Sequence, residues 1–143
     1  MILYFDSAYI AKCYLPEPGG EKVRALARSA SGLYSSALSV AELACVFHRQ
    51  ARECAAAPES ITTLRRQFRQ DLTDEVWSLI PVTDRLLHRV DALIRSLPMS
   101  CLLRAGDAIH LVTAIDAGFH EIWTNDRRLL AAVEAAGLQG RTV

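Results

Sequence analysis

Four acidic side chains occupy similar places along this sequence and could together perform metal-assisted chemistry. Asp6 ends an apolar run, Asp126 follows another predicted strand, and Glu42 and Asp107 lie in the first turns of predicted helices. The helix dipole and free backbone N–H groups favour ionised carboxylates there, and ionised carboxylates bind hard cations through oxygen. Converging carboxylates also repel one another, so one or two Mg²⁺ or Mn²⁺ ions would relieve the repulsion and leave room for water and a phosphodiester.

Asp6 is the acid for which a functional role is the strongest explanation. It follows the run Ile2–Phe5, whose unbroken apolar character predicts a strand buried on both faces of a parallel sheet. A carboxylate at the end of such a strand gains nothing from burial unless it is paired. Because ligands of open α/β sheets bind at the carboxyl ends of the strands, we expect Asp6 to face a site to which other strands deliver partners.

The other three acids also have simpler explanations. The segment Ser39-Val40-Ala41-Glu42 has the pattern of a capping box, in which Glu42 would only satisfy backbone donors. Asp126 could cap its helix, and Asp107 could be an ordinary acid of a first helical turn. Asp116 lies on the opposite face of the same predicted helix as Asp107, so we expect it to be solvated. The residue pattern alone leaves both roles open for Glu42, Asp107 and Asp126.

Two polar side chains lie close to Asp107 in the sequence. His110 shares an apolar helix face with Ile109 and Leu111, so we expect a hydrogen-bonded structural histidine rather than a base or a substrate contact. Arg104 precedes Asp107 by one helical turn and is a candidate phosphate contact, with a surface arginine beside a loop as the alternative.

Strands and helices alternate along the whole chain and must position these residues. Strands are predicted at 2–5, 33–37, 76–82 and 121–124, with a further short strand possible at 138–143. Helices are predicted at 7–14, 21–30, 39–54, 59–72, 83–97, 104–117 and 126–136, with a turn at 55–58. This alternation indicates an α/β fold of right-handed βαβ units, a three-layer α/β/α sandwich around a central parallel sheet.

The composition indicates one compact cytoplasmic domain. A chain of 143 residues with 51% hydrophobic content suits a single core, so residues 1–143 are predicted as one domain. Sixteen basic and sixteen acidic side chains give no net charge, so any polyanionic substrate must be met locally. The four scattered cysteines, Cys13, Cys45, Cys54 and Cys101, favour free thiols in a reducing compartment. Apolar segments are too short to predict a signal peptide or a membrane span.

In their order along the chain, several short motifs resemble those of PIN-domain proteins, and more narrowly those of VapC-type toxins of type II toxin–antitoxin systems. The motifs are Phe5-Asp6-Ser7, Leu15-Pro16-Glu17-Pro18-Gly19, Ser39-Val40-Ala41-Glu42-Leu43, Arg104-Ala105-Gly106-Asp107-Ala108-Ile109-His110-Leu111 and Trp123-Thr124-Asn125-Asp126-Arg127-Arg128-Leu129. The resemblance implies a parallel sheet in the order 3-2-1-4-5, endoribonuclease activity at an acidic Mg²⁺ or Mn²⁺ site, and a cognate antitoxin. Carried over by position, the site acids are Asp6, Glu42, Asp107 and Asp126.

The resemblance also bears on supporting residues and on mechanism. The family often has a second hydroxyl residue two places after the first acid, where this chain has Ala8. Ser7 and Thr124 remain as hydroxyls that could orient a metal-bound water. The expected reaction is metal-dependent hydrolysis of an RNA phosphodiester, which requires no side-chain nucleophile.

Other classes of protein also place an acid at a strand end. A receiver domain would require an acidic pair in the first βα loop and a lysine after Thr124, and a haloacid-type phosphatase would require acid-x-acid where Asp6 is followed by Ser7 and Ala8. Both are poor fits. The serious alternative is a catalytically inactive PIN scaffold that acts only as an RNA- or protein-binding module.

Two consecutive amphipathic helices, 40–54 and 59–72, suggest where a protein partner would bind. Their apolar side chains exceed what one small domain can cover, which predicts a groove for an amphipathic antitoxin helix. The residues concerned are Ala44, Phe47, Ala51, Ile61 and Phe68. We also expect toxin protomers to pair as a homodimer.

Overall fold

The computed structural model describes residues 1–53 and 58–143 and has a central parallel β-sheet. Its strands are β1 (Ile2–Tyr4), β2 (Gly32–Ser36), β3 (Trp77–Ile80), β4 (Glu121–Trp123) and β5 (Gln139–Arg141). Parallel pairing joins β3 to β2, β2 to β1 and β4 to β5. A parallel bridge between Phe5 and Trp123 connects the two groups of strands. The strand order is therefore 3-2-1-4-5, as predicted.

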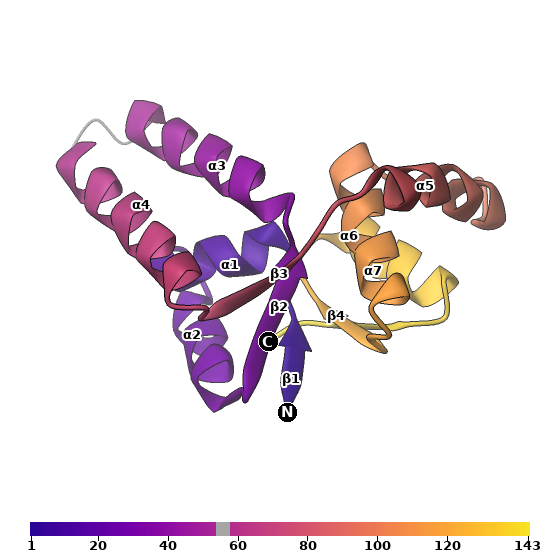
Figure 1. Cartoon of the computed structure of the whole chain (residues 1–143), viewed down its shortest axis with the longest axis horizontal. Helices are drawn as coiled ribbons and strands as arrows, with labels where there is room; N and C mark the ends of the chain where they lie inside the picture. Colours follow the sequence, from indigo (N-terminus) through magenta and orange to yellow (C-terminus); the bar gives the residue numbers. More distant parts are fainter. Residues whose placement is uncertain (54–57) are drawn as a thin grey trace.

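Helices cover both faces of this sheet, so the predicted α/β three-layer sandwich is confirmed (Figure 1). Helices α1 to α4 lie on one side and α5 to α7 on the other. Their bounds are α1 (Ser7–Tyr14), α2 (Gly20–Ser29), α3 (Ser39–Glu53), α4 (Pro58–Thr73), α5 (Asp84–Ser96), α6 (Ala105–Asp116) and α7 (Arg127–Ala135). Each predicted helix is present, and its ends lie within one residue of their predicted positions. The predicted turn at 55–58 and the thiol of Cys54 fall largely outside the described residues.

The first strand separates two hydrophobic clusters. Leu3 and Phe5 point into the cluster under α1 to α4, whereas Tyr4 points into the cluster under α6 and α7. All three side chains are fully buried, which confirms a strand covered on both faces. Ile2 is the exception, because 57% of it is exposed at the open end of the strand. The buried part of the run therefore begins at Leu3.

Local residue signals mark the starts and ends of several helices at or near the predicted positions. Thr83 caps α5 by accepting a hydrogen bond from Leu86 N–H at 3.2 Å. Gly118 and Gly137 follow the C-cap residues of α6 and α7 and have positive φ angles of 78° and 86°, a conformation that glycine adopts without strain. Short connections follow, and they return the chain to the sheet edge.

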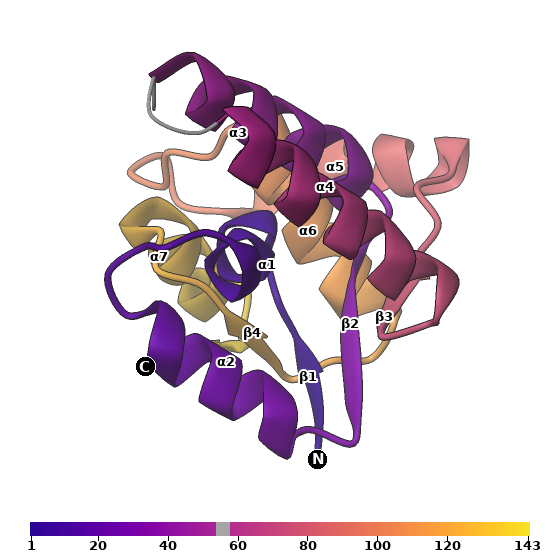
Figure 2. The ribbon, with the colours of Figure 1, turned by 90° about the vertical axis from the view of Figure 1, so that its left-hand side faces the viewer.

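Helices α3 and α4 lie side by side as an antiparallel pair that extends beyond the sheet, as Figure 2 shows from the side. Phe47 of α3 and Phe68 of α4 are both buried, and their ring centroids are 6.2 Å apart. None of the helices within residues 1–53 and 58–143 is long and apolar enough to cross a membrane.

Candidate active site

The four predicted site acids come from four different elements. Asp6 is the N-cap of α1 directly after β1, and Asp126 is the N-cap of α7 shortly after β4. Glu42 and Asp107 lie in the first turns of α3 and α6. The chain order reverses at β1, which lies between β2 and β4, and Asp6 N–H donates to the Trp123 carbonyl at 3.2 Å. Such a reversal point is where open α/β sheets bind ligands.

Asp6 is almost completely buried, with 5% exposed, and both its carboxylate oxygens are hydrogen-bonded. Oδ1 accepts from Tyr9 N–H at 2.9 Å, and Oδ2 accepts a short hydrogen bond from the Thr124 hydroxyl. Burial raises the pKa of Asp6 to about 6, although Thr124 and the charge of His110 act in the opposite direction. Asp6 therefore carries a carboxylate whose negative charge is incompletely compensated.

Glu42 is held from behind by two side chains. Its Oε1 accepts a hydrogen bond from the Ser7 hydroxyl at 2.7 Å and lies 2.8 Å from His110 Nε2. Burial alone would raise the pKa of Glu42, but the hydrogen bond and charge of His110, together with Ser7, hold it below its usual value. Glu42 is consequently ionised despite its partial burial.

The capping-box explanation of Glu42 is wrong. Ser39 lies inside α3 rather than before it, and its hydroxyl contacts the hydroxyls of Ser7 at 3.0 Å and Ser35 at 2.8 Å. Glu42 N–H donates to the Leu38 carbonyl at 3.1 Å, so it does not need the Ser39 side chain. The side chains of Ser39 and Glu42 therefore bind residues from other elements and not each other's backbone, as a capping box would require.

Asp126 and Asp107 differ in how their carboxylates are held. Asp126 Oδ1 accepts from Arg128 N–H at 2.8 Å and from Leu129 N–H at 3.2 Å, so Asp126 does cap α7, one of the two roles that the sequence left open. Asp107 is half-buried, and no hydrogen bond within the described part of the chain holds its carboxylate. Burial, then the charges of Asp126 and Glu42, raise the pKa of Asp107. The carboxylates of α3, α6 and the β4–α7 loop are therefore close enough to repel one another.

A glycine allows two of these elements to approach closely. A Cβ atom on Gly106 would lie 3.2 Å from Glu42 Oε2, so any larger residue would press on that oxygen. Gly106 directly precedes Asp107, and the missing side chain lets the start of α6 meet α3. Glu42 Oε1 is occupied by Ser7 and His110, whereas Oε2 faces the side of the site where Asp107 lies.

Comparison with known families supports this arrangement of motifs. The family model of the PIN domain matches residues 3–135. The chain belongs to the PIN domain family. No curated protein matches this PIN domain significantly in sequence.

Several solved structures share the PIN fold with this chain at low sequence identity. FitAcB from Neisseria gonorrhoeae has a TM-score of 0.72 and 19% identity, and the match covers 98% of this chain and 96% of that one. VapBC2 from Rickettsia felis, solved with a DNA fragment from its promoter, has a TM-score of 0.66 and 14% identity over 99% and 98% of the two chains. VapC20 from Mycobacterium tuberculosis, described as a Sarcin-Ricin loop cleaving toxin, has a TM-score of 0.69 and 16% identity over 96% of both chains.

The acids of this PIN domain have the chemistry of a site for a hard divalent cation, although they do not form a closed metal cage. Within residues 1–53 and 58–143, no three Asp, Glu, His or Cys side chains are grouped tightly enough to hold a metal ion. The donors are nevertheless all carboxylate oxygens, and a cation would offset both the burial of Asp107 and the nearby charges of Asp126 and Glu42, which together raise its pKa. The donor set therefore fits Mg²⁺ or Mn²⁺ by its chemistry.

The supporting residues have roles that differ in part from those predicted. Ser7 and Thr124 are buried, and their hydroxyls bind Glu42 and Asp6. Arg104 is the exposed N-cap residue of α6, and its charge lowers the pKa of Asp107. A contact between Arg104 and phosphate stays a prediction. Asp116 is exposed, as expected, and forms an ion pair with Arg89 at 2.6 Å.

The expectation that His110 is buried and hydrogen-bonded is confirmed, but its partners were not foreseen. Its ring is 2% exposed and lies between Tyr4 and Glu42. The sequence does indicate that His110 lies near the site, because a residue at i+3 from Asp107 projects from the same side of α6. The two partners are distant in sequence, so spacing could not identify them.

Proposed function

We propose that this PIN domain is a metal-dependent endoribonuclease and the toxin component of a type II toxin–antitoxin system. The observation behind the proposal is that four acids stand at the starts of four helices around the reversal point of the sheet. Burial and, after it, the charges of Asp126 and Glu42 raise the pKa of Asp107. The resemblance to VapC20, described as a Sarcin-Ricin loop cleaving toxin, supports RNA as substrate. The resemblance to FitAcB is also consistent with the proposed function.

Asp6, Glu42, Asp107 and Asp126 are the residues that would hold Mg²⁺ or Mn²⁺. The bound ion would supply a more acidic water and offset the negative charge that develops on the phosphodiester. The Thr124 hydroxyl fixes the orientation of the Asp6 carboxylate. Ser7 and His110 fix the orientation of the Glu42 carboxylate. Asp126 keeps Oδ2 available while Oδ1 caps α7.

Charge at the site also determines how the substrate would bind. Four carboxylates repel a phosphodiester, so RNA binding requires both the cation and positive side chains at the rim. Arg104 is exposed next to Asp107 and is the proposed phosphate contact. This explains why a chain without net charge could still bind RNA.

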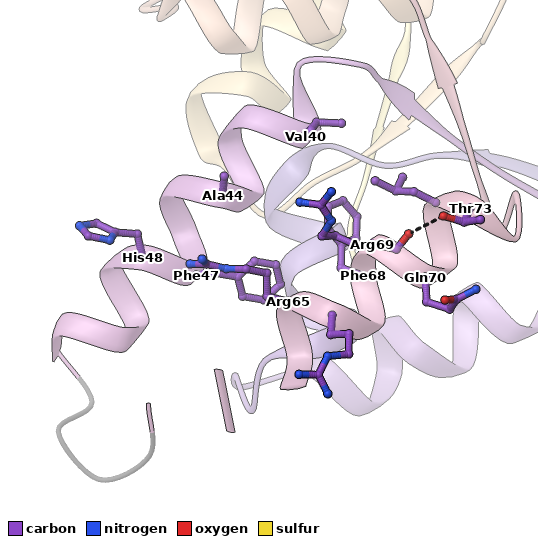
Figure 3. Close-up of a pocket in the computed structure, with 11 residues that line it drawn as sticks. Val40, Ala44, Phe47, His48, Arg65, Phe68, Arg69, Gln70 and Thr73 are labelled. Carbon is purple, nitrogen blue, oxygen red and sulfur yellow. Dashed lines mark hydrogen bonds between the residues drawn. The ribbon is translucent and has the colours of Figure 1, made fainter. Parts of the chain in front are cut away.

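The proposed protein partner is a small antitoxin that binds the groove between α3 and α4 (Figure 3). The groove has a volume of about 680 Å³ and is lined in part by Phe47 and Phe68. Both rings and Ile61 are buried within the domain, so the prediction that these three side chains lack cover is wrong. Arg65, Arg66 and Arg69 line the α4 side, so an amphipathic segment with acidic residues would complement it. Val40, in the same first turn as Glu42, lines the groove as well, so a basic side chain of the partner could extend to the acids.

Compartment and assembly complete the proposal. Cys13, Cys45 and Cys101 are free thiols, which agrees with the reducing cytoplasm. The toxin would pair with a second copy of itself, which light scattering of the purified protein would test.

The deciding experiment combines metal binding with RNA cleavage. We expect the wild-type chain to bind Mn²⁺ saturably and to cleave RNA only with Mg²⁺ or Mn²⁺, and Asp107→Asn to lose both without unfolding. The nearby Asp116→Asn is the matched control, because Asp116 lies on the same helix but pairs with Arg89. Mn²⁺ binding and RNA binding without cleavage by the wild type would favour the inactive scaffold. Cleavage of RNA by a folded Asp107→Asn would reject the proposed mechanism.

A further inference from the structure

A buried chain of polar groups runs from the first strand to the acid site. The Tyr4 hydroxyl lies 3.1 Å from His110 Nδ1, and His110 Nε2 lies 2.8 Å from Glu42 Oε1. Tyr4 is 0% exposed and His110 is 2% exposed, so water does not compete with these contacts. Three elements, β1, α6 and α3, are therefore linked through one imidazole ring.

The direction of the hydrogen bond to Glu42 follows from the role of its Oε1 atom. Oε1 already accepts a hydrogen bond from the Ser7 hydroxyl, so His110 Nε2 carries the hydrogen in the second contact to that acceptor. The Tyr4 hydroxyl can either donate to or accept from Nδ1, so the second ring nitrogen also has a hydrogen-bond partner. Tyr4 thereby fixes the orientation of the ring, and the ring presents an N–H group to Glu42.

Ser7 strengthens the same contact. Its hydroxyl donates to Glu42 Oε1 at 2.7 Å and lies 3.1 Å from His110 Nε2. Both donors reach the same carboxylate oxygen, so Oε1 is fully engaged. Oε2 is left facing Gly106 and the start of α6. The Glu42 carboxylate is therefore held through Oε1, and no hydrogen-bond donor within the described residues binds Oε2.

We infer that His110, fixed by Tyr4, is a positioning residue that holds Glu42 by Oε1 and keeps Oε2 turned toward the acid site. Without this contact, a partly buried glutamate in the first turn of α3 would lose rotamer freedom on binding a cation or turn toward solvent. The histidine is too buried to touch a substrate, so it acts through Glu42. The inference rests on the proposed function only where it concerns the cation.

The test compares variants of His110 in the full chain by Mn²⁺ calorimetry. We expect His110→Leu to weaken Mn²⁺ binding roughly 10-fold or more, the size typical of lost support behind a metal ligand. His110→Gln keeps a donor and should recover part of the affinity. In a Glu42→Gln background His110→Leu should have no further effect, because its action passes through Glu42. Unchanged affinity in folded His110→Leu, or an equal loss in both backgrounds, would overturn the inference.

A matched pair of tyrosines separates positioning from general stability. Tyr4→Phe removes the hydroxyl that meets His110, whereas Tyr14→Phe removes one that meets Asp71 and Trp77 away from the acids. Both should lower the melting temperature, but only Tyr4→Phe should weaken Mn²⁺ binding. Equal Mn²⁺ affinities in the two variants would contradict the role of Tyr4.

A second measurement needs no metal and separates this inference from the proposed function. The ¹³C chemical shift of the Glu42 side-chain carboxyl should change in His110→Leu and stay close to wild type in the exposed control His88→Leu. A wild type that binds no Mn²⁺ would defeat the proposed function, and the carboxyl shift would still decide whether His110 holds Glu42. An unchanged shift in His110→Leu would overturn the inference.

Discussion

Thr124 donates a hydrogen bond to Asp6 Oδ2, although the two residues are 118 positions apart in the sequence. The same hydroxyl oxygen accepts from Asp126 N–H at 3.0 Å. One threonine thus joins the acid after β1 to the backbone of the acid after β4. This side chain fixes the geometry across the point where the strand order reverses.

Thr124→Val should therefore damage both stability and metal binding. Loss of the hydroxyl leaves a buried carboxylate oxygen without its donor, which costs on the order of 1–3 kcal/mol. Urea unfolding would measure the stability, and calorimetry would measure Mn²⁺ binding. Thr124→Ser is the matched control, because it keeps the hydroxyl and should retain most of the affinity. Wild-type behaviour of Thr124→Val in both measurements would show that the contact is unimportant.

Asp6→Asn should stabilise the metal-free protein above about pH 6. Burial raises the pKa of Asp6 from 3.8 to about 6, so the folded state binds this proton more tightly than the unfolded state. Its contribution to stability is present at low pH and is lost as the pH rises through about 6. At higher pH the charged group costs up to roughly 3 kcal/mol, which the neutral amide avoids.

Thermal melts in a chelator across this pH range would measure the effect of Asp6→Asn. The difference in melting temperature from wild type should be largest in the alkaline range and shrink toward about pH 4. Adding Mn²⁺ should stabilise the wild type and leave Asp6→Asn unchanged. A difference independent of pH would mean that the charge of Asp6 is not the cause.

Substitutions of Asp126 should separate its capping role from its proposed role at the metal. Asn caps helices as well as Asp does, so Asp126→Asn should keep its stability and lose Mn²⁺ binding, whereas Asp126→Ala should also lose about 0.5–2 kcal/mol. Thr83→Ala, which removes the cap of α5 alone, should lose stability and keep Mn²⁺ binding. Normal Mn²⁺ binding by Asp126→Asn would remove Asp126 from the site.

Charge reversal in the α3–α4 groove should weaken antitoxin binding without affecting RNA cleavage. Arg65 and Arg69 line the groove and are exposed, so Arg65→Glu with Arg69→Glu should repel acidic partner residues. We expect the dissociation constant for the proposed antitoxin to rise roughly 10- to 100-fold. Arg85→Glu, an exposed change on α5 across the sheet, is the charge-matched control. Equal losses in both proteins would indicate a non-specific effect of charge.

Cysteine labelling should distinguish two thiols on neighbouring helices. Burial raises the pKa of the Cys13 thiol to about 12, so almost no reactive thiolate forms at mildly alkaline pH. Cys45 is exposed on α3. Peptide mapping after brief iodoacetamide treatment should show modification of Cys45 at least roughly 10-fold faster than of Cys13. Similar rates would show that burial of Cys13 against its neighbouring elements does not protect its thiol.

Much of the fold was predictable because its signals are local. The apolar run before Asp6, the caps at Thr83 and Asp126 and the glycines after α6 and α7 each depend on residues within a few positions of one another. Alternating strands and helices then restrict the topology to parallel βαβ units. The positions of the four acids at the starts of helices also follow from this local pattern.

The sequence by itself therefore determined the elements, their order and which acids stand at their ends. Tertiary structure alone decided the partner of each acid: Asp6 meets Thr124, and Glu42 meets His110 across 68 positions rather than its neighbour Ser39. Spacing cannot encode such pairs, because helical periodicity fixes a side chain only relative to its own helix. The approach of α6 to α3 at Gly106 brings the ring to the carboxylate, and burial away from water then makes that contact stronger than a local cap.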